Sequence, residues 1–170
     1  SSGLGVQFAH ALADFGADIA ILARRQEKLE SVKQELEQTY QTKVEAITCD
    51  VTDENQVKEA VSEVMTKFSQ VDILVNNAGV GGIGLLEEMT LQDWQKVIDV
   101  NLTGVFLCSR EFGKVMIEKK YGKIINIASI FGAVGNLAFP VVAYHATKGG
   151  VVNLTRGLAA EWAKHNITVN

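Results

Sequence analysis

The sequence predicts an α/β protein in which a doubly wound parallel sheet is covered by helices on both faces. Short β-branched runs alternate along the chain with amphipathic stretches of helical period, and this alternation is typical of right-handed βαβ units. A glycine-bearing turn at Gly3-Leu4-Gly5 leads directly into a helical run. With 170 residues and 47% hydrophobic content, the chain can bury a sizeable core. We expect residues 1–170 to form one domain.

The composition argues against several classes of protein. Twenty acidic and 16 basic residues give a net charge of −4 without a basic patch, so we expect no nucleic-acid partner. No apolar run approaches the roughly 20 residues that cross a bilayer, so we expect no membrane partner. Cys49 and Cys108 form no metal-ligand pattern, and neither do the three histidines. We expect no metal site and two buried thiols in a reducing, cytoplasmic compartment.

The first turn has the form of a phosphate-binding turn. Ser1-Ser2-Gly3-Leu4-Gly5 precedes a helical run from Val6 to Phe15, and such a turn presents backbone N–H groups and a positive helix end to a pyrophosphate. Close helix–strand packing is the alternative use of its glycines. The turn needs a preceding strand, and residues 167–170 begin a further strand that is cut short. We therefore expect the sequence to be truncated at both ends.

Two arginines follow the next strand, Asp18–Ala23. In dinucleotide-binding folds this strand end faces the adenosine ribose, where an acidic side chain suits a 2′-hydroxyl and an arginine suits a 2′-phosphate. Arg24 and its neighbour Arg25 stand there, which favours NADP(H) over NAD(H). In the alternative interpretation, the arginines are a solvated start to the helix Gln26–Tyr40.

Polar or small residues also follow the next two strands. Asp50-Val51 ends the strand Val44–Cys49, where Asp50 is either a turn residue or part of a ligand site. Thr52 or Asp53 then caps a helix. The strand Asp72–Asn76 leads into Asn77-Ala78-Gly79, whose small residues admit a cofactor close to the backbone. The asparagine of this turn can also brace neighbouring strands.

Tyr144 and Lys148 form the centre of the expected active site. They stand at i and i+4 in a run that continues to about Ala163, so a helix places the phenol and the ammonium on one face. A neighbouring cation favours the phenolate of a tyrosine, whose ordinary pKa is near ~10, and brings it toward the working range of an acid-base catalyst. The alternative is a pair on the helix surface without chemistry.

Two more polar residues stand at unusual places. Asn101 interrupts a long helical pattern that continues to about Lys120, where asparagine has poor helix propensity. We expect either a break without chemistry or a functional kink. Ser129 ends the β-branched run that starts at Gly122 and precedes a loop over residues 130–143. Thr90–Asp93 resembles a capping box with Asp in place of Glu.

Taken together, these motifs resemble the classical short-chain dehydrogenase/reductases. The resemblance rests on Asn76-Asn77-Ala78-Gly79, Asn101, Ser129 and the Tyr144-x-x-x-Lys148 motif, and it covers the whole chain. It implies a Rossmann-type fold whose central first strand is missing here. It also implies a nicotinamide cofactor that carries a hydride, and the reversible oxidation of a secondary alcohol to a ketone.

The resemblance assigns a role to each matching residue. Ser129 donates a hydrogen bond to the substrate oxygen, Tyr144 passes the proton, and Lys148 promotes the tyrosine phenolate and holds the nicotinamide ribose. Asn101 holds a water of the proton path, and Asp50-Val51 meets the adenine ring. The cofactor contacts expected on this basis are Ser2, Gly3, Leu4, Gly5, Arg24, Arg25, Asp50, Val51, Asn77, Ala78, Gly79, Tyr144 and Lys148.

Within the family, three stretches look most similar to the gluconate 5-dehydrogenase group. They are Asn136–Pro140, Tyr144-His145 and Glu161–Lys164, and they indicate a sugar-acid substrate. The alternative is a 3-oxoacyl-carrier-protein reductase. We expect His145 to be a packing or surface residue.

The helices over about 103–120 and 144–165 carry more apolar side chains than one sheet face needs. They include Val105, Phe106, Phe112, Val115 and Met116 on the first helix and Val151, Val152, Leu158 and Trp162 on the second. The resemblance implies that these helices pair across a two-fold axis, so we expect a homotetramer or homodimer. In the alternative interpretation, the chain as given is a catalytically incompetent fragment that folds only partly or pairs with intact subunits.

Overall fold

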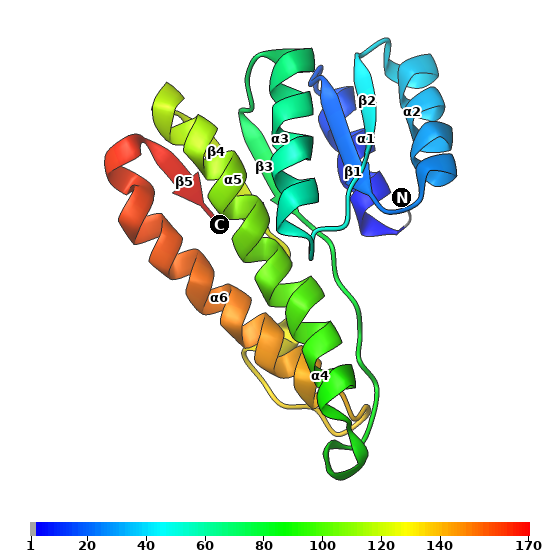
Figure 1. The fold of residues 1–170 in the computed structure, drawn as a ribbon, viewed down its shortest axis with the longest axis vertical. Coiled ribbons are helices and arrows are strands. Elements are labelled where there is room, and N and C mark those ends of the chain that lie inside the picture. The colour runs from blue at the N-terminus through cyan, green and yellow to red at the C-terminus, as the bar shows by residue number, and fades with distance from the viewer. Residues whose placement is uncertain (1–2) are drawn as a thin grey trace. The chain divides into compact units, whose positions relative to one another are not determined.

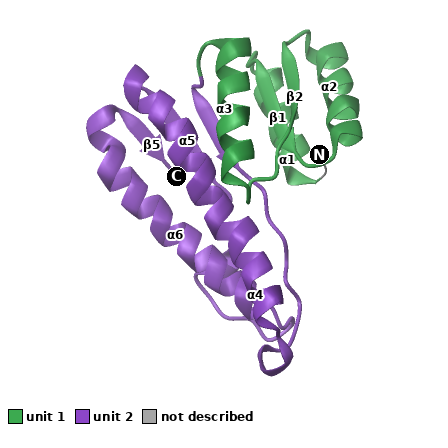
Figure 2. Cartoon of the chain, in the orientation of Figure 1, with its two compact units in different colours: residues 1–70 green, residues 71–170 purple. Residues whose placement is uncertain are grey.

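A computed structural model describes residues 3–170 and divides into two compact units, Ser1–Gln70 and Val71–Asn170 (Figure 2). Ser2, one of the expected cofactor contacts, lies outside the described residues. Figure 1 shows the course of the chain within each unit.

The first unit contains a two-stranded parallel sheet and three helices. Its elements are α1 (Leu4–Asp14), β1 (Ile19–Ala23), α2 (Gln26–Tyr40), β2 (Val44–Thr48) and α3 (Glu54–Phe68). Ile19 of β1 stands opposite Val44 of β2. The core of this unit joins α1, α2 and both strands through buried apolar side chains: Ala9, Ala13, Ile19, Val32, Leu36 and Val44.

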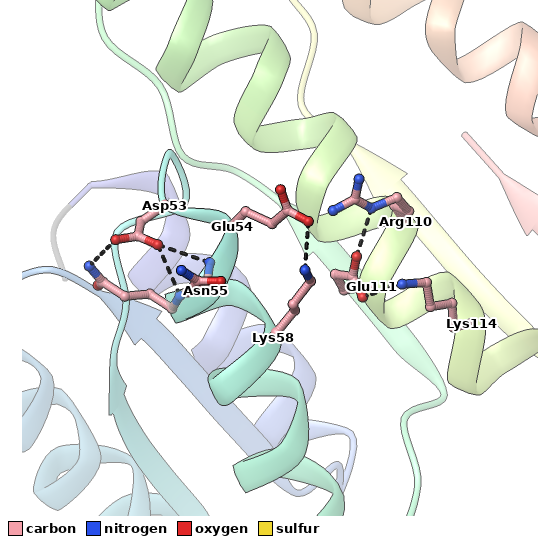
Figure 3. Close-up of polar contacts among 8 residues, drawn as sticks. Asp53, Glu54, Asn55, Lys58, Arg110, Glu111 and Lys114 are labelled. Carbon is pink, nitrogen blue, oxygen red and sulfur yellow. Dashed lines mark hydrogen bonds and ion pairs between the residues drawn. The ribbon is translucent and has the colours of Figure 1, made fainter.

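The caps of the helices in the first unit follow the sequence signals. Asp53, and not Thr52, caps α3, because its side chain accepts hydrogen bonds from the backbone N–H groups of Asn55 and Gln56 at 2.9 and 3.2 Å (Figure 3). The Gln56 side chain also donates to Asp53, at 3.0 Å. The hydrogen bonds from the backbone and side chain of Gln56 hold the pKa of Asp53 below its ordinary value. The apolar stripe of α2, Leu29, Val32 and Leu36, is buried as its spacing predicts.

The second unit contains a three-stranded parallel sheet with the strand order β3-β4-β5. Its elements are β3 (Ile73–Asn76), α4 (Leu91–Ile98), α5 (Gly104–Lys119), β4 (Gly122–Asn126), α6 (Val142–Trp162) and β5 (Ile167–Val169). The core between helices and sheet is formed by buried side chains: Met116, Ile124, Trp162, Ile167 and Val169. The expected capping of α4 is confirmed, since Thr90 Oγ1 accepts a hydrogen bond from the Asp93 N–H at 3.1 Å.

A π-helical turn, Asp99–Thr103, joins α4 to α5. The N–H of Gly104 donates to the carbonyl of Asp99, five residues earlier. The long helical pattern is therefore interrupted at Asn101, as its sequence suggests, but by one wide turn and not by a break in the helix.

On α5, Glu111 is buried between two cations. Its carboxylate accepts from Arg110 Nε and Lys114 Nζ, both at 2.6 Å, while its side chain is 8% exposed (Figure 3). The bond from Lys114, followed by that from Arg110, keeps the pKa of Glu111 below its ordinary value against the effect of burial. The buried carboxylate is thus charged and paired on both sides.

The expected parallel α/β class is confirmed, and one expected strand is too long. Among residues 3–170 the strands pair in two separate parallel sheets, β1-β2 and β3-β4-β5. We expected β4 to reach Ser129, but it ends at Asn126, which stands opposite Asn76 at the end of β3. Only one further ladder bond follows, from the Ile127 N–H to the Asn76 carbonyl at 2.9 Å. Within the described part of the chain, no helix is long and apolar enough to cross a membrane.

Candidate active site

Tyr144 and Lys148 lie one turn apart near the start of α6. Lys148 Nζ is 5.5 Å from the centroid of the Tyr144 ring, within the range of a cation–π contact. The two side chains therefore share one helix face, as their spacing suggests. Tyr144 is partly exposed, whereas Lys148 is buried, with 4% of its surface exposed.

Lys148 is a buried cation with a defined partner. Its Nζ donates to the backbone carbonyl of Ile127 at 2.5 Å, just beyond the end of β4. Burial lowers the pKa of Lys148 below its ordinary value. An ammonium has three donors, so two remain beyond this bond within residues 3–170. A ligand that enters here meets a cation already oriented by the sheet.

Asn101 is completely buried and connects three segments of the second unit. Its Oδ1 accepts from the Val80 N–H at 2.8 Å, and its Nδ2 donates to the Val80 carbonyl at 2.9 Å. The same Nδ2 donates to Thr147 Oγ1 at 3.2 Å, and that hydroxyl donates to the Tyr144 carbonyl at 2.9 Å. Asn101 thus links the π-helical turn to the loop after β3 and to the turn of α6 that carries Tyr144.

Gly79 lies against this cluster. A Cβ atom placed on it would be 3.5 Å from Asn101 Oδ1 and 3.9 Å from Lys148 Nζ. A larger side chain would fill the space beside both polar groups. The structure therefore brings three predicted site residues, Gly79, Asn101 and Lys148, together, and Lys148 in turn lies near the ring of Tyr144.

Ser129 follows Ile127, the anchor of Lys148, by two residues in the chain. Its Oγ accepts from the Phe131 N–H at 3.2 Å and caps a short 3-10 turn, Ile130–Gly132. This turn packs closely on α6, because a Cβ atom on Gly132 would be 2.7 Å from the Lys148 carbonyl oxygen. The ring of Phe131 meets the ring of Tyr144 edge-on, with centroids 6.3 Å apart.

The strand bracing expected of the Asn77 turn is performed by its neighbour. Asn76 Nδ2 donates to Asn126 Oδ1 at 2.8 Å and to Ser109 Oγ at 3.0 Å. Asn126 in turn donates to Thr155 Oγ1 at 2.9 Å. Asn76 is the last residue of β3, and its partners Asn126 and Ser109 are buried with it. Bracing by Asn77 itself stays a prediction. Asn77 and Ala78 follow β3 in the chain segment that leads to Gly79.

The predicted residues of the first unit lie at strand and helix ends. Gly3 is the N-cap of α1, and Leu4 and Gly5 are in its first turn. Arg24 Nη1 approaches Asp50 Oδ2 at 3.8 Å, with the arginine side chain 67% exposed. Asp50 Oδ1 accepts from the N–H and hydroxyl of Thr52 at 3.0 and 2.8 Å, so the turn role of Asp50 is present. Arg25 is the N-cap residue of α2, and Val51 is partly buried.

Two participants were not identified from the sequence. Thr147 is completely buried between Asn101 and the Tyr144 carbonyl, and its position directly before Lys148 was the available signal. The carbonyl of Ile127 gives no signal in a sequence, because any residue supplies one. Its role follows only from where β4 ends.

Comparison with known proteins identifies the family. The family model for short chain dehydrogenases matches residues 1–170. A galactitol 2-dehydrogenase of Rhizobium johnstonii is 40% identical over 98% of this chain and 65% of its own length. A 3-oxoacyl-[acyl-carrier-protein] reductase of Staphylococcus aureus is 42% identical over 100% of the chain and 68% of its own length.

A solved structure is similar to this chain in fold as well as in sequence. The gluconate 5-dehydrogenase of Burkholderia cenocepacia, in complex with NADP and tartrate, superposes with a TM-score of 0.93 at 34% identity, over 99% of this chain and 65% of that one. The chain spans about two thirds of the length of the relatives it matches. The chain belongs to the short chain dehydrogenase family, because the family model matches all its residues and because it has the parallel α/β units and the Tyr144-x-x-x-Lys148 helix.

Proposed function

We propose that this chain carries the catalytic residues of an NAD(P)(H)-dependent oxidoreductase that interconverts a secondary alcohol and a ketone. One observation carries the proposal: the buried ammonium of Lys148 lies 5.5 Å from the ring of Tyr144, on the helix that Asn101 ties to the loop after β3 through Thr147. A tyrosine and a fixed ammonium on one helix face can together position a proton donor for a substrate oxygen.

Each residue has a proposed task in this reaction. Tyr144 transfers the proton to or from the substrate oxygen, and Ser129 donates a hydrogen bond to that oxygen. Lys148 stabilises the phenolate form of Tyr144 and holds the nicotinamide ribose with its remaining donors. Both donors of Asn101 are engaged with Val80 and Thr147, so a relay water would bind to its second Oδ1 lone pair or to the main chain.

The residues present suit a dinucleotide. When bound, the nicotinamide supplies or accepts a hydride. The close approach of Gly79 to Asn101 and Lys148 supports its proposed place, with Asn77 and Ala78, beside the nicotinamide half. The start of α1 supports pyrophosphate binding, because Gly3 has a φ of 66° and no side chain among residues 3–170 caps the helix. We assign the adenosine half to Arg24, Arg25, Asp50 and Val51.

The arginines further favour NADP(H) in our proposal. Arg24 is 67% exposed, and its contact with Asp50 is long at 3.8 Å, so it contributes little and a 2′-phosphate can compete for it. The complex of the gluconate 5-dehydrogenase with NADP is in line with this preference.

For the substrate we propose a sugar acid, in line with the gluconate 5-dehydrogenase that was solved with tartrate. The second candidate is a 3-oxoacyl thioester. It is favoured by the apolar side chains exposed on the loop before α6, where Leu137 is fully exposed and Phe139 is 59% exposed. A substrate panel containing gluconates, sugar alcohols and acetoacetyl thioesters separates the two candidates by their kcat/KM values.

The substitution Tyr144→Phe in the full-length protein tests the proposal. Loss of the phenol should reduce turnover by at least about 100-fold, since a positioned acid-base group contributes at least this much. Dinucleotide binding, followed by fluorescence titration, should remain largely unchanged. Tyr121→Phe, at a tyrosine that lies beside the surface amines of Lys119 and Lys123, is the matched control. Activity of the Tyr144 variant within about tenfold of the wild type would sink the assignment.

A further inference from the structure

The loop between Gly132 and α6 is held by one side-chain pair. Asn136 Nδ2 lies 3.1 Å from His145 Nε2, and His145 directly follows Tyr144 in α6. The loop side chains around Asn136 are mostly exposed, so packing contributes little to their order. From the sequence, Asn136 contributed only to the family resemblance, and His145 was expected to be a packing or surface residue.

The atoms of this pair fix the direction of its hydrogen bond. His145 Nδ1 lies 2.9 Å from the Val141 carbonyl, which can only accept, so Nδ1 carries the proton and Nε2 is the acceptor in a neutral ring. Asn136 Oδ1 accepts from the N–H groups of Ala138 and Phe139 at 3.0 and 2.8 Å. The amide nitrogen of Asn136 is therefore the donor to Nε2.

The imidazole ring is also fixed in orientation. Phe131 stacks on it with ring centroids 4.8 Å apart and an interplanar angle of 11°, while the same Phe131 forms a T-shaped contact with Tyr144. Beyond Asn136, the Pro140 carbonyl accepts from the Gly84 N–H at 2.8 Å. A chain of contacts thus runs from the helix turn of Tyr144 through His145 and Asn136 to the loop after β3.

That second loop borders a cavity. Gly84 lines a cavity of about 320 Å³ in the second unit, together with Val80 and apolar side chains that include Ile83, Leu85 and Met89. Val80 is the residue whose backbone is held by Asn101. The Asn136–His145 pair therefore positions the loop that is hydrogen-bonded to the wall of this cavity.

We propose that Asn136 and His145 are positioning residues that hold loop 133–140 in one conformation beside Tyr144 and thereby set the affinity for the substrate. This inference rests on the proposed oxidoreductase function. Neither side chain takes part in proton transfer. If the loop samples other conformations, the apparent substrate affinity equals the intrinsic affinity multiplied by the fraction of molecules whose loop is in the competent conformation.

Kinetics of Asn136→Ala and His145→Phe in the full-length protein test the inference. Each variant loses the link, and the phenyl ring retains the stacking on Phe131. One lost hydrogen bond changes the loop equilibrium by roughly fivefold, so KM for the substrate should rise by up to about this factor, while kcat and dinucleotide affinity stay near the wild-type values. His165→Phe, outside this loop, controls for the loss of a histidine. Unchanged KM in both variants, or a fall in kcat alone, overturns the inference.

Two readouts do not require turnover. The amide protons of Ala138 and Phe139 should exchange faster in Asn136→Ala, and the imidazole nitrogens of His145 should report the Nδ1–H tautomer in the wild type. The opposite tautomer, or unchanged exchange at both amides, contradicts the geometry of the pair. A wild-type protein that turns over no alcohol or ketone while both readouts agree would refute the proposed function and leave the loop assignment standing.

Discussion

The ammonium of Lys148 lies in a buried position where the charged form of the side chain is disfavoured. The side chain is buried, and this burial lowers its pKa, so the folded protein sacrifices some stability to keep an ammonium beside Tyr144. The bond to the Ile127 carbonyl offsets part of that loss. A buried cation without an acidic partner among its described contacts is typical of a site that acts on a ligand.

The substitution Lys148→Met makes this loss of stability measurable. Because the pKa of Lys148 is lower in the folded than in the unfolded protein, the unfolded chain binds the additional proton, and wild-type stability rises with pH through the window between the two pKa values. The methionine variant lacks this dependence. The difference in free energy of unfolding should therefore move in favour of the wild type as pH rises through the alkaline range.

Denaturant titrations at several pH values measure this difference, with the exposed Lys164→Met as control. A pH-independent difference would mean that Lys148 is not desolvated in the folded protein. Turnover of the methionine variant should fall by at least about 100-fold, since the proton-transfer group has lost its cation.

Arg24 decides the cofactor in our proposal, and one substitution addresses it. An aspartate at this position repels a 2′-phosphate and accepts from a 2′-hydroxyl. Arg24→Asp should shift the ratio of kcat/KM for NADP(H) over NAD(H) by roughly tenfold or more toward NAD(H), as expected when a charged hydrogen bond of about 1.5 to 3 kcal/mol is lost. Arg156→Asp, on α6, serves as the charge-matched control. An unchanged ratio would show that Arg24 is only a solvated side chain.

At the scale of elements, the π-helical turn and α6 depend on each other through one hydroxyl. Thr147 Oγ1 accepts from Asn101 and donates to the Tyr144 carbonyl, and the side chains of Asn101 and Thr147 are both fully buried. The isosteric Thr147→Val removes both bonds and leaves an amide donor of Asn101 unpaired. Stability should fall by about 1 to 3 kcal/mol.

Urea unfolding of Thr147→Val measures the loss, and Thr39→Val on α2, whose threonine is exposed and bonds within its own helix, is the control. Substrate turnover should fall as well, because Asn101 and the Tyr144 turn lose their common anchor. A loss of stability no larger than in the control would mean that water satisfies Asn101 in solution.

Elements set by local signals could be predicted, and those set by distant partners could not. Helix α2 was predicted with its observed bounds because its apolar stripe is regular. In the structure the helix ends where Gln41 takes a left-handed conformation with φ 52°. Strand β4 was predicted too long because its end is set by the end of β3, and an apolar run does not reveal where its neighbour stops. The candidate site follows the same rule. The spacing of Tyr144 and Lys148 predicts their shared face, but the bonds of Asn101 to Val80 depend on tertiary structure.

At the scale of the molecule, α5 and α6 expose less apolar surface for assembly than their sequences suggest. Five of the apolar residues that suggested surplus surface on α5 and α6 are buried within the chain: Val105, Phe112, Met116, Val151 and Trp162. They were counted wrongly because each helix packs on more than a sheet face. Phe106 remains 43% exposed on α5, with Arg110 over its ring at 5.0 Å.

We still propose a homotetramer for the full-length protein, with a homodimer as the simpler assembly. Phe106→Asp should shift the population toward smaller species, because a charge replaces an exposed aromatic side chain of the kind enriched in interfaces. Light scattering at micromolar concentration distinguishes the states, with Phe15→Asp, at a residue 92% exposed in the first unit, as the control. A monomeric wild-type protein would overturn the proposal.

The wide turn at Asp99–Thr103 acts as an insertion of one residue into an otherwise continuous helix. Each residue of an α-helix turns the chain by about 100°, so deleting one residue from this turn would restore ordinary α-helical bonding and rotate one flank by that angle relative to the other. Asn101 could then face Val80 and Thr147 only if α5 turned its buried side away from the sheet. The site therefore requires the rotation of α5 relative to α4 that this inserted residue sets, and not only an asparagine at position 101. A related chain with an equally good Asn and one residue fewer here would fold the same helix and lose the site.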